Sequence, residues 1–373
     1  MTPSPPLYKH ISLLITISCL TGLYCCVNGD NESNNIHGMF VFGSSLVDNG
    51  NNNFLDNMAK ADYLPYGIDF PSGPSGRFTN GKNVIDLLCD QIRLPSYIPA
   101  FANPSTKGRK IVHGVNYASG ASGILDDTGS IVGNVTSLSK QIRNFEEVTL
   151  PDLEEQLGSN SNNISRESLP NNYLFILGTG GNDYSFNYFM RKNTSTASLQ
   201  AFTDNLMKSL SNQIQKLYNL GARKLVLMSI NPIGCSPMVL TDPPGCLEGL
   251  NEAAQLFNAQ LQSLVDVLKP QMPGSNLVFV NSYEIIREII RNPASRGFKD
   301  ASNACCEIGS VSEGGSGILC KRGGDACEDR TSHVFFDGLH PTEAVNVEIA
   351  DKAYASNVKT EVYPINVRQL VSL

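Results

Sequence analysis

The sequence predicts an α/β fold in which helices cover both faces of a parallel sheet. Short apolar runs suited to buried strands alternate along the 373 residues with longer runs of helical periodicity, an order typical of parallel sheets. Hydrophobic residues make up 41% of the chain, which is enough for a sizeable core. Neither a shift in composition nor an internal repeat marks a boundary, so we expect a single domain over residues 30–373.

A signal peptide is expected over residues 1–29. The basic Lys9 precedes an apolar run at residues 11–27, and Gly29 then offers a small residue for cleavage. The length of that run leaves an uncleaved membrane anchor as the alternative. No later stretch of the sequence is apolar enough to cross a bilayer, so we expect a secreted protein with no stable membrane span after cleavage.

The first half of the chain predicts strands that run into glycine turns. Residues 39–43 are an apolar strand followed by a long loop rich in Asn, Gly and Pro. The stretch NGKNVIDLLCDQI is expected to be a helix with Asn80 near its cap, and SLSKQIRNFEEV is expected to be another. GVNYASGASGI begins extended and ends in a turn, and YLFILGTGGNDY is a strand that ends in a further turn.

The second half of the chain has the clearest helical pattern. Apolar residues recur three and four apart from Leu199 to Leu220, and Gly221 should end that helix at its C′ position. RKLVLMSI and NLVFVNS suit buried strands, with a second amphipathic helix over residues 250–268 between them. YEIIREII is a further helix, and PTEAVNVEIADKAYA should close the domain as a helix with Pro341 in its first turn.

The expected surface is that of an acidic secreted glycoprotein. The formal net charge is -7 and no basic run is present, so we expect no nucleic-acid partner. Asn134-Val-Thr, Asn163-Ile-Ser and Asn193-Thr-Ser are acceptor sequences for glycosylation, and a signal peptide makes their use expected. The oligomeric state is left open.

Cysteines beyond the signal peptide should form disulfides in an oxidising compartment. They are Cys89, Cys235, Cys246, Cys305, Cys306, Cys320 and Cys327. Cys235 and Cys246 bracket the loop CSPMVLTDPPGC and should form a local bridge. The last four lie in a Gly-rich segment and should form two bridges, with two pairings open because adjacent cysteines rarely bond each other. Cys89 is left as a buried thiol, and a zinc site is the alternative for the cluster, although its spacing matches no usual C-x2-C pair.

The stretch VFGSSLVDNGNNN places Ser44 and Ser45 where a strand leaves the sheet. An ordinary turn is the simplest interpretation. A nucleophilic serine is the alternative, because open α/β sheets place their sites at the carboxyl ends of strands. Such a serine needs an imidazole base and a carboxylate that orients the base. Among the histidines after the signal peptide, only His340 follows an acid, Asp337, in an Asp-x-x-His turn that leads into a helix.

The other glycine turns carry groups that could stabilise the anion formed during acyl transfer. The backbone N–H groups of Gly120 and of the nucleophile are candidate donors, and the side-chain amide of Asn182 is another. Each is also an ordinary turn residue, so only their combination indicates a site. This chemistry needs no cofactor and no metal.

The blocks FVFGSSLVDNGNNN, GVNYASGASGI, GTGGNDY, NPIGCSP and FFDGLHPTEAVN occur in an order that resembles plant-type GDSL esterases/lipases of the SGNH hydrolase superfamily. The resemblance covers nearly the whole chain from about Met39 to the final helix. It implies a three-layer α/β/α sandwich and the hydrolysis of small-molecule or lipid esters in the apoplast or cell wall. The triad that it implies is Ser45, Asp337 and His340. The oxyanion hole that it implies is formed by Ser45, Gly120 and Asn182.

One departure from the family block Gly-Asp-Ser-Leu is present, because Ser44 stands where the family has an acid. LVDNGNNN fixes the register, so Ser45 remains the expected nucleophile. A secreted serine esterase or lipase with an acyl-enzyme intermediate is therefore the first hypothesis, and acyl transfer to an alcohol would use the same site. A non-catalytic secreted glycoprotein is the second hypothesis, and Ser44 is the residue that favours it. No Gly-x-Ser-x-Gly occurs, which excludes the nucleophile elbow of α/β-hydrolases.

Overall fold

A largely parallel sheet forms the centre of the computed structural model, which describes residues 36–158, 169–190, 197–240, 245–313 and 315–373. Within those residues the sheet has six strands in the order β2-β1-β3-β4-β5-β8, and β8 runs antiparallel to β5. They are β1 (Gly38–Gly43), β2 (Gly114–Asn116), β3 (Tyr173–Gly178), β4 (Lys224–Met228), β5 (Asn276–Val280) and β8 (Val362–Tyr363). Because β1, β3 and β4 are parallel neighbours, their carboxyl ends meet at one edge of the sheet.

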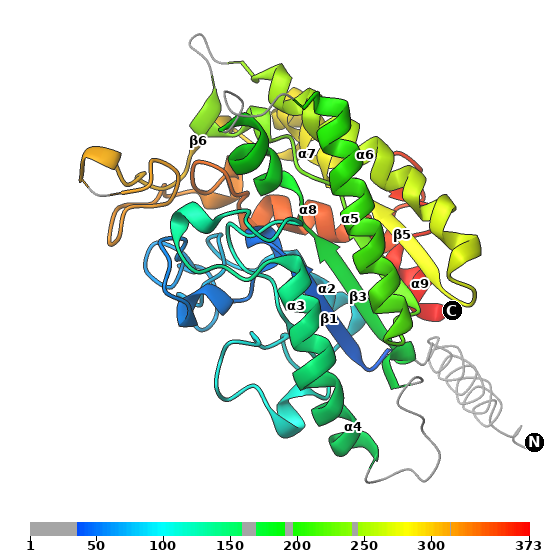
Figure 1. Cartoon of the computed structure of the whole chain (residues 1–373). Coiled ribbons are helices and arrows are strands. Elements are labelled where there is room, and N and C mark those ends of the chain that lie inside the picture. Colours follow the sequence, from blue (N-terminus) through cyan, green and yellow to red (C-terminus); the bar gives the residue numbers. More distant parts are fainter. Residues whose placement is uncertain (1–35, 159–168, 191–196, 241–244, 314) are drawn as a thin grey trace, which may run out of the picture. The chain divides into compact units, whose positions relative to one another are not determined.

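Helices cover both faces of this sheet. One face packs against α3 (Leu138–Asn144), α4 (Leu150–Gly158), α5 (Leu199–Asn219) and α6 (Glu248–Leu268), and the other against α2 (Val84–Ile92), α7 (Ser282–Arg291), α8 (Glu343–Ala355) and α9 (Val367–Ser372). The alternation of strand side chains decides the faces, because Phe40 and Phe42 enter the first core and Met39 and Val41 the second. Figure 1 shows α3, α5 and α6 in front of the strands. The predicted three-layer α/β/α sandwich is confirmed.

Helix boundaries follow local capping chemistry. Asn83 caps α2 by accepting backbone N–H groups of its first turn. The expected cap, Asn80, lies outside that helix, and its side-chain oxygen instead accepts the N–H of Glu343 at the start of α8 (2.8 Å). Pro341 lies before the N-cap of α8 rather than in its first turn, which corrects the expected boundary. Gly221 follows α5 with a φ of 103°, as its C′ position requires.

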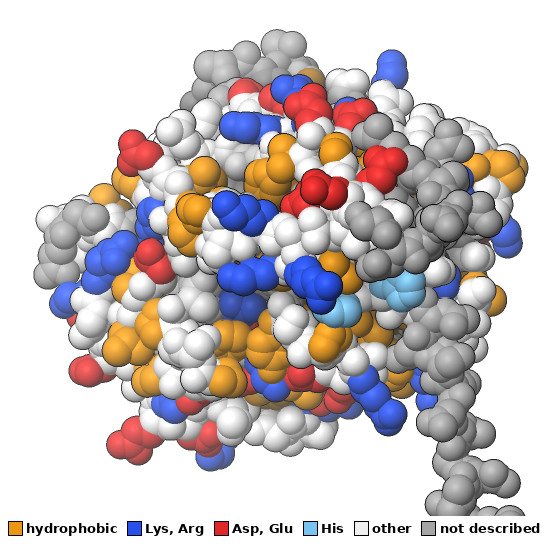
Figure 2. Space-filling model, turned by 90° about the horizontal axis from the view of Figure 1, so that it is seen from below, with side chains coloured by type: hydrophobic (Ala, Val, Ile, Leu, Met, Phe, Trp, Pro, Cys, Tyr) orange, Lys and Arg blue, Asp and Glu red, His pale blue; other side chains and the backbone are white. Residues whose placement is uncertain are grey.

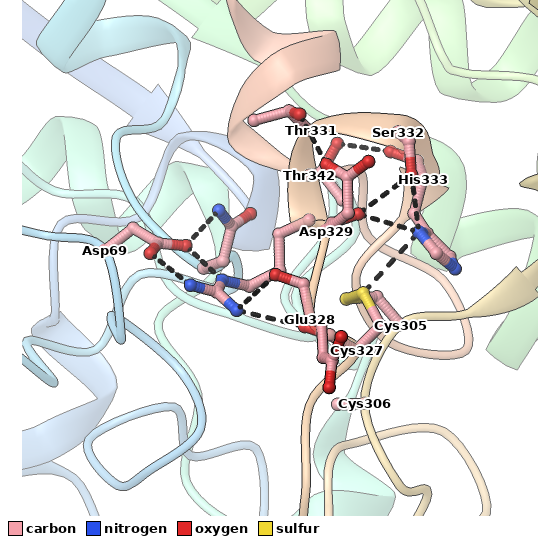
Figure 3. The surroundings of a disulfide bond; sticks show 12 residues. Asp69, Cys305, Cys306, Cys327, Glu328, Asp329, Thr331, Ser332, His333 and Thr342 are labelled. Carbon is pink, nitrogen blue, oxygen red and sulfur yellow. Dashed lines mark hydrogen bonds and ion pairs between the residues drawn. A yellow bond between two sulfur atoms is a disulfide. The ribbon is translucent and has the colours of Figure 1, made fainter. Parts of the chain in front are cut away.

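Disulfides tie down the Gly-rich segment beside a short parallel pair, β6 (Asp300–Ala304) and β7 (His333–Phe335). The bridges are Cys235–Cys246, Cys305–Cys327 and Cys306–Cys320, and Cys89 is a buried free thiol. The pairing that the sequence left open is thereby settled. The zinc alternative loses its thiolates, because all four sulfurs of the cluster are bonded in pairs. Figure 3 shows the surroundings of the Cys305–Cys327 bridge.

The surface carries charges of both signs. Figure 2 shows lysine, arginine, aspartate and glutamate side chains interspersed with apolar ones on the face seen from below. Asn134 is exposed, whereas Asn163, Asn193 and the expected signal peptide lie outside the described residues. Of the residues that the structure describes, no helix combines the length and apolarity that a membrane span needs.

Opening a bridge of the Gly-rich segment should destabilise the fold. Replacing Cys306 and Cys320 together by Ser should lower the free energy of unfolding by about 3 kcal/mol, because the unfolded chain regains loop entropy. Urea unfolding measures the loss, and Cys89→Ala, which leaves every bridge intact, is the control. Peptide mapping without reduction should recover the pairs described above, and a Cys305–Cys320 crosslink would contradict them.

Candidate active site

The chain leaves β1 at a glycine because the neighbouring backbone leaves no room for a side chain. A Cβ on Gly43 would lie 2.1 Å from the carbonyl oxygen of Gly178, the last residue of β3, and Gly43 has a φ of +142°. The N–H of Ser44 then donates to that same carbonyl oxygen at 3.0 Å. Ser45 follows at the start of a short 3-10 turn. The strand end therefore holds both serines at the carboxyl edge of the sheet.

A continuous hydrogen-bonded chain joins Ser45, His340 and Asp337. The distance from Ser45 Oγ to His340 Nε2 is 2.7 Å, and His340 Nδ1 lies 2.8 Å from Asp337 Oδ2. Asp337 is 0% exposed and His340 is 3% exposed, so water competes little for these contacts. Since the carboxylate accepts at Nδ1, the hydrogen of the imidazole lies there, and Nε2 is free to accept the serine hydroxyl proton. The structure thus brings Ser45 to the Asp337–His340 turn across a sequence separation of 295 residues.

Donors surround the Asp337 carboxylate and hold its orientation. Oδ1 accepts the backbone N–H groups of Leu339 (2.8 Å) and His340 (2.7 Å). The phenol of Tyr66 donates to Oδ2 at 2.6 Å. Burial, and then the nearby Asp337 charge, raise the pKa of Tyr66 well above its ordinary value of 10.0, so the phenol remains a donor. The ring of Phe78 lies 4.9 Å from the imidazole, between ring centroids, and supports its position.

Sequence reasoning did not find Tyr66 or Phe78. Both lie in the loop that follows the serines, where no periodic pattern or motif marks them. The Tyr66–Asp337 hydrogen bond spans a sequence separation of 271 residues, so only the folded chain reveals it.

The candidate oxyanion donors divide into two groups. Ser45 and Asn182 line the same cavity, and the side-chain amide of Asn182 donates one hydrogen bond to the carbonyl oxygen of Ser122 (2.9 Å). Among the described residues, the N–H of Ser45 has no protein acceptor. The N–H of Gly120 donates instead to Asp48 Oδ2 at 3.0 Å, and Gly120 does not line the cavity. The geometry therefore places Asn182 in the same cavity as Ser45 and leaves the Gly120 N–H engaged by a protein carboxylate.

The Asn-rich stretch after the serines joins the glycine turn that follows β2 to the turn that follows β1. Asp48 Oδ1 accepts the N–H groups of Gly50 (2.7 Å) and Asn51 (2.8 Å) while Oδ2 accepts that of Gly120. The side-chain oxygen of Asn52 accepts the Ser119 hydroxyl (2.6 Å), and its amide donates to the carbonyl oxygen of Gly120 (3.0 Å). These buried side chains replace the backbone ladders that a helix or strand would supply. The composition that disfavours regular structure is what holds this loop in place.

Asp183 holds the turn that follows β3 in the same way. Its buried carboxylate accepts the N–H groups of Ile124 (2.9 Å) and Leu125 (3.0 Å) and the hydroxyl of Thr128 (2.7 Å). Asp183 directly follows Asn182, so these bonds fix the position of the amide that faces the cavity. Burial raises the pKa of both Asp48 and Asp183 to about 6, although the donated hydrogen bonds lower it in part.

Two other residues that the sequence singled out lie apart from this chain of contacts. Ser44 is 8% exposed, lines the cavity, and its hydroxyl has no hydrogen-bond partner among the described residues. His333 Nδ1 lies 3.1 Å from the carbonyl oxygen of Asp329 and 3.5 Å from Cys327 Sγ, beside the disulfide in Figure 3. These contacts place His333 in the disulfide segment rather than beside Ser45.

A hydroxyl, an imidazole and a carboxylate linked in series at the carboxyl edge of a parallel sheet have the arrangement of a serine hydrolase. The family model for GDSL-like Lipase/Acylhydrolase matches residues 39–353. The chain is 40% identical to GDSL esterase/lipase At1g29670 of Arabidopsis thaliana over 90% of this chain and 91% of the relative. It is 38% identical to GDSL esterase/lipase 7 of the same plant over 90% of this chain and 92% of the relative. The chain therefore belongs to the GDSL family of lipases and acylhydrolases, which are carboxylic ester hydrolases.

The buried carboxyls Asp48 and Asp183 should make stability fall as the pH rises from about 4 to 6. A pKa raised from 3.8 to about 6 in the folded protein means that the folded state keeps protons that the unfolded state has released. Each group therefore stabilises most below pH ~4, and a rise of this size corresponds to about 3 kcal/mol lost by pH ~7. Urea unfolding across this range should show that the stability advantage of the wild type over Asp48→Asn shrinks by that amount.

Curves for the wild type and Asp48→Asn that stay parallel from pH ~4 to ~7 would contradict a raised pKa at Asp48.

Proposed function

We propose that this protein is a secreted serine esterase or lipase that hydrolyses acyl esters through a Ser45-His340-Asp337 triad. The observation that carries the proposal is the hydrogen-bonded chain from Ser45 Oγ through His340 to Asp337, at 2.7 Å and 2.8 Å, which faces a cavity. Serine hydroxyls are weak nucleophiles until a base takes their proton, and this chain supplies both the base and its orienting carboxylate.

The proposed reaction proceeds in two halves. Ser45 Oγ attacks the ester carbonyl carbon while its proton passes to His340 Nε2, and the resulting oxyanion accepts hydrogen bonds from the Ser45 N–H and the Asn182 amide. Collapse of this intermediate breaks the bond to the alcohol oxygen, which takes the proton from His340. Water then attacks the acyl-enzyme with His340 again as base, and the acid and free Ser45 result. Gly120 contributes to the oxyanion hole in this scheme only if its N–H is released from Asp48 Oδ2.

Secretion is supported by the disulfides and by the sequence of the first residues. We propose that residues 1–29 are a signal peptide and that residues 30–373 are one hydrolase domain, and the compact unit Ile36–Val371 agrees with that domain. Disulfides persist in oxidising compartments, and those of the described segment are consistent with an extracellular site such as the apoplast. Glycosylation at Asn134, Asn163 and Asn193 belongs to the same proposal.

Ser44 is the observation that favours the non-catalytic alternative. The family acid is absent there, and the hydroxyl that replaces it forms no hydrogen bond among the described residues. The chain from Ser45 to Asp337 is nevertheless continuous without it. Acyl transfer to an alcohol is distinguished from hydrolysis by adding alcohols to the assay and analysing the products.

Removing the proposed base or its orienting acid should abolish turnover and keep the fold. His340→Ala and Asp337→Asn should each lower kcat for p-nitrophenyl butyrate by about a thousandfold or more. The first variant removes the group that accepts the Ser45 proton. The second removes the carboxylate that holds the imidazole of His340 in the tautomer that can accept it. Circular dichroism should show that the folded state persists. His333→Ala is the control, and a loss of turnover in that variant rather than in His340→Ala would place the base at His333.

The adjacent serines should respond differently to a fluorophosphonate probe, which reacts with an activated oxygen. Ser45→Ala should lose labelling, whereas Ser44→Ala should label at a rate within about threefold of the wild type, since its hydroxyl has no partner to lose. Gel fluorescence measures how fast the probe labels each variant. The reverse pattern would move the nucleophile to Ser44, and a folded wild type that does not label would favour the non-catalytic alternative. Ser44→Asp restores the family acid and reports whether that charge adds activity.

A further inference from the structure

We propose that Tyr66 is a positioning residue of the triad and that it transmits the hold of the Cys306–Cys320 disulfide to the carboxylate of Asp337. This inference rests on the proposed function, because it concerns how the acid of the proposed triad is kept in place. It adds to that function a fourth side chain, which no sequence motif marks, and a covalent bond outside the cavity on which the rate of acyl transfer depends.

The two oxygens of the Asp337 carboxylate are held by different parts of the protein. Oδ1 accepts the backbone N–H groups of Leu339 and His340, which belong to the same turn as Asp337. Oδ2 accepts the imidazole N–H of His340 at 2.8 Å and the phenol of Tyr66 at 2.6 Å. Of the hydrogen-bond donors that the described part of the chain supplies to this carboxylate, Tyr66 is the only one outside that turn. The phenol therefore ties the acid, and through it the imidazole, to another part of the protein.

The phenol of Tyr66 is itself fixed by the Gly-rich segment. Its oxygen accepts the N–H of Cys320 at 3.1 Å, and Cys320 is bonded to Cys306. The N–H of Cys306 donates to the carbonyl oxygen of Phe336 at 2.9 Å, and Phe336 directly precedes Asp337. Covalent bonds and hydrogen bonds thus form a closed ring that leaves Asp337 through the phenol and returns to it through the disulfide. Opening the disulfide breaks this ring and loosens the backbone that holds the phenol.

Burial makes the phenol hard to replace. Tyr66 and Asp337 are both fully buried, so water cannot supply the donor that the carboxylate would lose with the hydroxyl. Burial also raises the pKa of Tyr66 well above its ordinary value, which keeps the phenol protonated. The ionisable groups around it are Asp337 and Tyr63, with His340 beyond the carboxylate and Arg322 over the Tyr63 ring. Tyr66 does not line the cavity, so its loss should act on the chemical step rather than on substrate binding.

The first experiment compares Tyr66→Phe with Tyr63→Phe. Tyr63 is the matched control, because its phenol donates to the carbonyl oxygen of the same Cys320 at 2.8 Å and forms no hydrogen bond with Asp337 in the described structure. Tyr66→Phe should lower kcat for p-nitrophenyl butyrate about tenfold and change KM by less than about twofold, because the phenol holds the acid and not the substrate.

The pH dependence of kcat/KM gives a second readout of the same two variants. A carboxylate that has lost a donor directs more of its charge to the imidazole and favours the protonated form. The acid limb of the profile should therefore lie about half a pH unit higher in Tyr66→Phe than in the wild type. Tyr63→Phe should match the wild type in kcat, KM and profile.

A double-mutant cycle tests the route through the disulfide. Cys306→Ser with Cys320→Ser should lower kcat about threefold in the wild-type background and by less than about 1.5-fold in the Tyr66→Phe background, because the phenol that transmits the hold is already gone. Cys305→Ser with Cys327→Ser opens the other bridge of the segment, whose cysteines form no hydrogen bond with Tyr66 in the described structure. Its effect on kcat should be the same in both backgrounds. Circular dichroism fixes a temperature at which all variants are folded.

A spectroscopic measurement separates this inference from the proposed function. The proton on His340 Nδ1 should give a low-field NMR resonance, which should move downfield in Tyr66→Phe because Oδ2 then has no other donor to share its charge. The resonance should stay in place in Tyr63→Phe. A wild type that neither hydrolyses esters nor reacts with a fluorophosphonate would overturn the proposed function, while this shift would still support the link from Tyr66 to Asp337.

An unchanged pH profile and an unchanged resonance in Tyr66→Phe would overturn the inference and leave the esterase in place. A cycle in which Cys306→Ser with Cys320→Ser lowers kcat by the same factor in both backgrounds would overturn it as well. If Tyr66→Phe loses its fold, the variant with Cys306→Ser and Cys320→Ser decides the question. Its resonance should also move downfield, and an unshifted resonance would show that the bridge does not act on the carboxylate.

Discussion

The close approach of two backbones, at Gly43 and Gly178, is the constraint on which the site depends. With a Cβ at position 43 only 2.1 Å from the Gly178 carbonyl oxygen, the strand end accepts no residue but glycine without moving β3. The next N–H donates to the same oxygen, so the start of the serine turn is tied to the sheet itself. Loops are ordinarily the mobile part of a fold, and this contact gives the proposed nucleophile the rigidity of a strand.

The far end of the chain reaches the same edge by a different route. β7 leads directly into Asp337, and its last residue, Phe335, accepts the N–H of Cys305, while Phe336 accepts that of Cys306. The disulfides of those cysteines therefore brace the segment that carries the proposed acid and base. A Gly-rich stretch with little core of its own can hold a carboxylate in register because covalent bonds limit its freedom.

Function and stability conflict at the buried carboxylates. Asp48 and Asp183 are fully buried, and the pKa of each is raised to about 6, so keeping them ionised near neutral pH costs free energy. Asp48 accepts the N–H of Gly120 and Asp183 that of Ile124, and both donors lie in the stretch that follows β2. The protein accepts this cost where loops without regular structure must converge on one site, since a carboxylate can accept from several donors at once.

The sequence by itself determined the layers of the fold, the strand that carries Ser45, and the turn that carries Asp337 and His340. These follow from periodicity and from residue types within short stretches, which local physics controls. The tertiary structure decided the contacts that depend on distant partners. These are the disulfide between Cys305 and Cys327, the hydrogen bond from the Tyr66 phenol to Asp337, and the hydrogen bond from the Gly120 N–H to Asp48. The cap at Asn83 and the use of Asn80 by α8 belong to the same class. Each of these contacts has several acceptable partners along the chain, and only packing of the folded layers brings one of them within hydrogen-bonding or covalent distance.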